Sequence, residues 1–210
     1  MDDGDRKLAR LLEHPAIWRG RAAARPDVRT SGYAALDEQL PGGGWPRHGL
    51  IEILVARFGS GELQLLLPSL AAATQSPCAR WCVWVAPPLM PFAPALVAQG
   101  IVLERVAVVG GERPLWAFEQ VLGSGACDAA LAWVKRPRAR DIRRLQLAAE
   151  RGRTLGVLFR PQRAARESSA AQLRLSVQAT RAGVRVAVLK GRSAARGTVE
   201  LTDHDGWPRL

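Results

Sequence analysis

Strand-like and helix-like segments alternate along most of this chain, and the alternation limits the folds available to it. Five short apolar runs are bounded by Gly, Pro or charged residues, and helix-like stretches separate them. Parallel strands need such crossover helices, and strands buried on both faces are apolar throughout. The pattern therefore predicts an α/β fold with a mostly parallel, twisted sheet flanked by helices. The predicted strands are residues 50–56, 80–86, 105–110, 127–134 and 154–160.

The pattern changes after residue 160. Residues 173–180 and 184–192 alternate apolar and other side chains and are joined by a short Arg-Ala-Gly turn, so they predict a C-terminal antiparallel β-hairpin. Residues 197–202 predict a further edge strand. We expect a helical arm and linker over residues 1–28, one domain over 29–202 and a tail over 203–210.

Composition excludes several classes of protein. Hydrophobic residues make up 48% of the 210 residues, so the chain is not disordered. No apolar run approaches the ~20 residues needed to span a bilayer, and the acidic N-terminus does not resemble a secretory signal. The three cysteines form no CxxC pair and the three histidines are scattered. We therefore expect a cytoplasmic protein with no membrane contact, no disulfides and no metal site.

A short glycine turn follows the first predicted strand and resembles a phosphate-binding loop. A working P-loop cradles phosphates with backbone N–H groups, and its Lys and Ser or Thr contact phosphate and Mg²⁺. Here an acid and a leucine take those two positions, and no acid ends a later buried strand to hold the metal. The sequence therefore predicts a degenerate P-loop, no cofactor and no enzymatic activity. Its residues are Gly59, Ser60, Gly61, Glu62 and Leu63.

Longer motifs extend this resemblance. The order "GLIEILVARFGSGELQLLLPSLAAA", "RWCVWVAPPLMPFAPALVAQGI" and "LWAFEQVLGSGACDAALAWV" resembles the RecA core. "SGYAALDEQLPGGGWPRHGLIEIL", "WVAPPLMPFAPALVAQGI" and "SGACDAALAW" resemble ImuA, a RecA-like family whose members are often labelled SulA-like. The resemblance covers residues 30–202. It implies a RecA-like P-loop fold.

The ImuA resemblance also implies a function. We expect a non-catalytic accessory protein of translesion synthesis, induced in the DNA-damage (SOS) response and associated with the nucleoid. Its implied partners are an ImuB-type Y-family protein, an error-prone replicative-type DNA polymerase, RecA and single-stranded DNA. Two alternatives stay open, namely a DNA-stimulated ATPase of the RecA type and a SulA-like cell-division inhibitor.

Positive charge is concentrated in one part of the chain. Residues 135–196 hold 17 Lys and Arg against 3 acidic residues, whereas residues 1–134 are nearly balanced. In a RecA-like fold the loops after the fourth and fifth strands face DNA, and Arg binds phosphates well. A solvated basic face and an acidic protein partner are the alternatives. The DNA-binding candidates are Lys135, Arg136, Arg138, Arg140, Arg143, Arg144, Arg160, Arg163 and Arg166.

The C-terminal tail carries an apolar pair. Trp207 and Leu210 are unusual residues to leave in solvent, so we expect them either to dock on a partner or to pack back on the domain.

Overall fold

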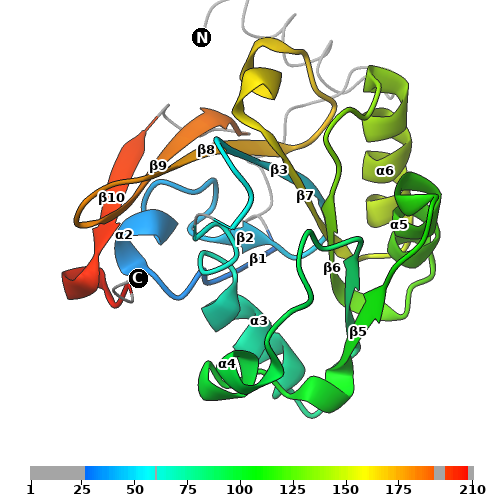
Figure 1. The fold of residues 1–210 in the computed structure, drawn as a ribbon, viewed down its shortest axis with the longest axis horizontal. Coiled ribbons are helices and arrows are strands. Elements are labelled where there is room, and N and C mark those ends of the chain that lie inside the picture. The colour runs from blue at the N-terminus through cyan, green and yellow to red at the C-terminus, as the bar shows by residue number, and fades with distance from the viewer. Residues whose placement is uncertain (1–26, 60, 192–196, 208–210) are drawn as a thin grey trace, which may run out of the picture.

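The centre of the molecule is an eight-stranded mixed sheet (Figure 1). The structure is a computed structural model and describes residues 27–59, 61–191 and 197–207. The strand order is β10-β9-β8-β3-β7-β6-β4-β5, with parallel pairing from β8 to β5 and antiparallel pairing from β8 to β10. Its strands are β3 (Gly49–Val55), β4 (Trp81–Val85), β5 (Val106–Val109), β6 (Cys127–Trp133), β7 (Leu155–Pro161), β8 (Leu173–Ala179), β9 (Gly183–Lys190) and β10 (Thr198–Thr202).

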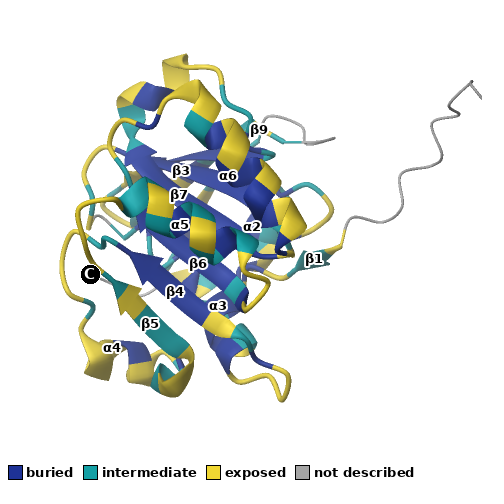
Figure 2. Ribbon diagram, turned by 90° about the vertical axis from the view of Figure 1, so that its right-hand side faces the viewer, coloured by how far each residue is buried: buried dark blue, intermediate teal, exposed yellow. Residues whose placement is uncertain are grey.

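Helices cover both faces of the sheet. One face carries Leu36 of α2, Leu70 of α3 and Leu96 of α4, and the other carries Phe118 of α5 and Ile142 of α6. Figure 2 shows α5 and α6 side by side with buried stripes toward the sheet. A short ribbon of β1 and β2 lies beside the sheet. The bounds are α2 (Ala34–Asp37), α3 (Leu67–Thr74), α4 (Ala93–Ala98), α5 (Pro114–Gly123), α6 (Ala139–Arg151), β1 (Val28–Arg29), β2 (Trp45–Pro46), η1 (Leu103–Arg105), η2 (Gln162–Arg166) and η3 (Asp203–Asp205).

The apolar pattern explains these layers. All seven residues of β3 are buried, because β7 and β8 pair with its two edges and helices cover both of its faces. In α6, Ile142 and Leu145 lie on the buried side, whereas Arg143 and Arg144 face solvent. An amphipathic helix buries its apolar stripe in this way.

The prediction of a RecA-like P-loop fold is wrong in the feature that defines a P-loop. In that motif a helix starts directly after the glycine turn and points its N-terminus at the phosphates. Here residues 62–66 form turns, and α3 begins only at Leu67, with Pro68 in its first turn. Proline is well accommodated at that helix position, because the N–H it lacks has no partner there. The glycine turn therefore has no helix N-terminus behind it.

The C-terminal segment packs on the domain as far as it is described. The Trp207 ring lies 5.7 Å from the Tyr33 ring, and its side chain is buried. Trp207 was predicted as a partner-binding candidate, and burial in the core contradicts that role. Leu210 and most of the predicted arm over residues 1–28 lie outside the described residues. Within the described part of the chain, no helix has the length and apolar character needed to cross a bilayer.

The three cysteines differ in accessibility. Cys78 is exposed, whereas Cys82 and Cys127 are buried on strands β4 and β6. Burial raises the pKa of the Cys82 thiol to about 12 and also raises the pKa of Cys127. Both buried thiols therefore stay protonated at neutral pH, and a thiol reagent needs the thiolate.

We expect native-state alkylation to label Cys78 alone. Intact-mass measurement after iodoacetamide at neutral pH should show one added group on the folded protein. After unfolding in guanidinium, all three thiols should react. Rapid addition of two or three groups to the folded protein would contradict the burial of Cys82 and Cys127.

Candidate functional site

The loop between β3 and α3 is closed by its own acidic side chain. Gly59 and Gly61 adopt φ angles of +85° and +93°, which suit glycine and strain other residues. The Glu62 carboxylate is buried, and its Oε1 accepts the Gly59 backbone N–H at 2.7 Å. Leu63 packs partly against the main core. The Glu62 carboxylate therefore occupies a backbone N–H group of the loop, and Ser60 lies outside the described residues.

Removing this internal contact should loosen the loop. Glu62→Ala leaves the Gly59 N–H without its carboxylate partner, so we expect a loss of about 1–3 kcal/mol in the free energy of unfolding. Glu62→Gln keeps an amide oxygen as acceptor and should cost less. Urea unfolding of the three proteins measures both values. Equal stabilities of wild type and Glu62→Ala would show that the Glu62 contact does not hold the loop.

A groove of about 360 Å³ lies between this loop and the proline-rich segment after β4. Trp84 and Trp133 line it from strands β4 and β6. The Trp133 ring stacks on Phe159 with centroids 4.7 Å apart, and the Trp84 ring lies 6.1 Å from the Trp133 ring. Because these rings are fixed by packing within the sheet, the inner wall of the groove is preformed.

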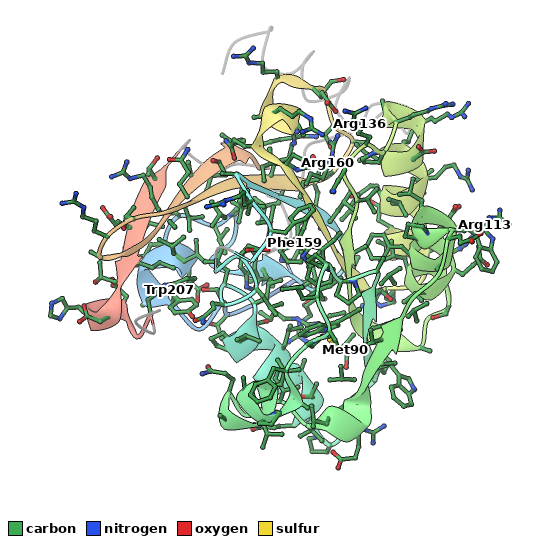
Figure 3. The ribbon with its side chains drawn as sticks, in the orientation of Figure 1. Met90, Arg113, Arg136, Phe159, Arg160 and Trp207 are labelled. Carbon is green, nitrogen blue, oxygen red and sulfur yellow. The ribbon has the colours of Figure 1, made fainter. Side chains whose placement is uncertain are left out.

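Three large apolar side chains stand on the other wall of the groove. Leu89 and Met90 are each 79% exposed and Phe92 is 71% exposed. We call these residues the apolar rim. Figure 3 shows Met90 on the segment between β4 and α4, well away from Arg136 and Arg160. Exposed apolar patches of this kind mark protein or ligand interaction sites.

The backbone holds the rim away from the core. Ala86 follows β4 with a φ of +49°, and its N–H donates to the Val109 carbonyl at 2.8 Å. This left-handed conformation costs a non-glycine residue about 1–2 kcal/mol. Three prolines follow within five residues and restrict the backbone, so the rim keeps its place when exposed. In the sequence, this proline-rich segment stands out only through the family resemblance. Apolar periodicity indicates which residues of a helix or strand are buried, and it cannot show that an apolar loop is exposed.

The predicted DNA-binding candidates differ in their exposure to solvent and in their ion pairs. Arg144 pairs with Glu119 on α5, and Arg140 lies 4.0 Å from Asp141. Arg160 was predicted to bind DNA, and the structure contradicts this because its side chain is only 1% exposed. The remaining candidates are exposed, namely Lys135, Arg136, Arg138, Arg143, Arg163 and Arg166.

Arg160 belongs to a buried ionic network instead. Glu52 on β3 is fully buried. Its carboxylate accepts hydrogen bonds from Arg160 Nη1 at 2.8 Å and from Arg174 Nε at 2.6 Å. Arg160 Nη2 also donates to the Glu167 carboxylate at 2.6 Å. Arg174 further donates to the backbone carbonyls of Ala164 and Glu167. The network therefore ties η2 and the turn after it to strands β3, β7 and β8.

Among the described residues, no group of His, Cys, Asp and Glu side chains could hold a metal ion. The arrangement offers an apolar groove with a protruding rim and a cationic neighbourhood, which suits binding of another molecule.

Comparisons with known proteins give the chain's relatives. No protein-family model matches it. It is 32% identical over 114 residues to the "Cell division inhibitor SulA" of Photorhabdus laumondii and 31% identical over 121 residues to that of Edwardsiella piscicida. These alignments cover 53% and 56% of this chain, and 63% and 71% of the two relatives. SulA from Pseudomonas aeruginosa is a solved structure with a TM-score of 0.45 and 23% identity, covering 53% of this chain and 97% of that one.

These relatives correct the predicted function. Both curated relatives are described as cell division inhibitors, so the role in translesion synthesis is wrong. The partners implied by that role are therefore wrong as well, namely the ImuB-type protein, the error-prone polymerase, RecA and single-stranded DNA. The ImuA assignment is not confirmed, and the SulA-like alternative is the one that the relatives support.

Proposed function

Because this chain belongs to the SulA family of cell division inhibitors, we propose that it inhibits division by binding the tubulin-like septum protein FtsZ. It acts in the cytoplasm as a binding protein and needs no nucleotide of its own. The loop supports a role without nucleotide, since the buried Glu62 carboxylate accepts the Gly59 N–H and would repel a phosphate there.

The apolar rim is the observation that carries this proposal. Leu89, Met90 and Phe92 together leave a large apolar surface in water beside a groove with a rigid aromatic wall. The cores of protein–protein interfaces are enriched in aromatic residues and Met, and a few such side chains dominate binding energy. The septum protein would bury the rim and place its own side chains in the groove.

Controlled expression of the chain tests the proposed function. Induction in the host bacterium should produce long filamentous cells with the septum protein no longer gathered at mid-cell. The strain should lack its translesion polymerases, so that any filamentation does not depend on them. An unrelated protein induced to the same level is the control. Normal cell length at that level of the folded chain would contradict the proposal.

A further inference from the structure

A second surface beside the groove is strongly basic. A hollow of about 350 Å³ lies where β3, β6 and β7 end, and Arg57, Lys135 and Arg163 line it together with Phe58. Arg136 and Arg166 follow Lys135 and Arg163 closely in the sequence and are exposed. We call Arg57, Lys135, Arg136, Arg163 and Arg166 the basic edge.

Within the described residues, four of these five charges have no counter-ion. In the described part of the chain, Lys135, Arg136, Arg163 and Arg166 form no ion pair. The carboxylates closest in sequence are engaged elsewhere. Glu167 binds Arg160, and Asp141 accepts the Arg138 backbone N–H at 2.9 Å. The basic edge therefore presents a net positive field to solvent.

The buried network fixes part of the basic edge in place. Arg174 donates to the Ala164 carbonyl at 2.7 Å and to the Glu167 carbonyl at 2.9 Å. These bonds fix the middle and the C-terminal end of η2, which carries Arg163 and Arg166. A surface held in this way loses less conformational entropy when a ligand binds.

The basic edge and the apolar groove share one loop. Arg57 and Phe58 line the basic hollow, and Gly59 and Glu62 line the groove directly after them. On β6 and just beyond it, Trp133 lines the groove and Lys135 lines the basic hollow. A partner that fills the groove beside Gly59 and Trp133 therefore lies next to the part of the basic edge formed by Arg57 and Lys135.

We propose that the basic edge binds carboxylates of an acidic segment of the septum protein, next to the apolar residues that the groove receives. This inference rests on the proposed function and names the chemistry of that partner. Charge complementarity of this kind raises the association rate and selects the partner. The continuity with an apolar groove favours a protein over a nucleic acid. Among the described residues that line the hollow, Phe58 is the one aromatic and is half-buried, whereas binding of single strands relies on aromatic stacking.

Charge reversal tests the inference on the full chain. Lys135→Glu with Arg163→Glu reverses two charges that line the hollow. Arg105→Glu with Arg181→Glu is the matched control, because both residues are exposed and line neither the groove nor the hollow. Biolayer interferometry measures the rate of association with purified septum protein at salt concentrations between roughly 50 and 300 mM. The first variant should associate about 10-fold or more slowly at low salt with a flatter salt dependence, and the control should stay within about 2-fold.

A second probe separates this inference from the proposed function. Fluorescent oligoglutamate should bind the wild-type chain at low salt and should bind Lys135→Glu with Arg163→Glu at least several-fold more weakly. If the septum protein does not bind but the peptide does, the proposed function fails and the acidic preference of the basic edge stands. Equal rates and equal peptide binding for all three proteins would overturn the inference. Binding of an oligonucleotide without binding of oligoglutamate would also overturn it.

Discussion

Phe92→Asp is expected to weaken binding to the septum protein about 100-fold while leaving the fold as stable as before. A carboxylate in the apolar interface must give up water without a partner, which costs several kcal/mol, and about 100-fold corresponds to ~2.7 kcal/mol. The free protein should tolerate the change. Phe92 is 71% exposed and is the N-cap residue of α4, a position where Asp is favoured.

A control variant tests whether loss of binding in Phe92→Asp comes from the groove or from any carboxylate added to the surface. Leu147 is an apolar residue on α6 that is 54% exposed and does not line the groove. Leu147→Glu also replaces an exposed apolar side chain by a carboxylate, and we expect its affinity to stay within about 2-fold of wild type, since it lies outside the interface. Equilibrium titration and thermal unfolding should be measured on both variants. Equal loss of affinity in both, or no loss in Phe92→Asp, would show that the rim is not the binding surface.

Glu52→Ala is expected to lower the free energy of unfolding by about 3–5 kcal/mol. The variant leaves two buried guanidinium groups without the carboxylate that binds both of them, and removing one partner of a buried pair costs about this much. For a protein with total stability of about 5–15 kcal/mol, this loss is large. Urea unfolding followed by tryptophan fluorescence would measure it.

Replacement of the whole network is the informative comparison. In Glu52→Leu with Arg160→Met and Arg174→Met, no buried charge remains unpaired, so the triple variant should be more stable than Glu52→Ala. The turn after β7 would still lose the bonds from Arg174 to its carbonyls. A loss below about 1 kcal/mol in Glu52→Ala would mean that the charges find water or other partners, contrary to the burial seen here.

Strand positions were largely predictable from this sequence. The run predicted over residues 127–134 is β6, Cys127–Trp133, and that predicted over 154–160 is β7, Leu155–Pro161. Continuous apolar runs and Gly or Pro boundaries carry this information locally. The predicted hairpin pairs as β8 with β9. Local pattern could not reveal that β8 also pairs in parallel with β3, because that contact joins distant parts of the chain.

The candidate site was harder to predict, because its features depend on tertiary contacts. The turn after β3 resembles a P-loop in sequence, yet α3 starts at Leu67 and the Glu62 carboxylate folds back onto Gly59. Arg160 looks like its exposed basic neighbours in the sequence and is buried because Glu52, far away in the chain, binds it. Leu89 and Met90 are apolar, as core residues are, yet both are 79% exposed on the segment that follows the left-handed residue Ala86.

Calorimetric titration of the chain into purified septum protein from the same organism tests the central claim most directly. The claim predicts saturable binding with a micromolar or lower dissociation constant for wild type and strongly reduced binding for Phe92→Asp. Absence of binding at ~100 μM of both folded proteins would contradict the account, because the apolar rim would then have no role toward this partner.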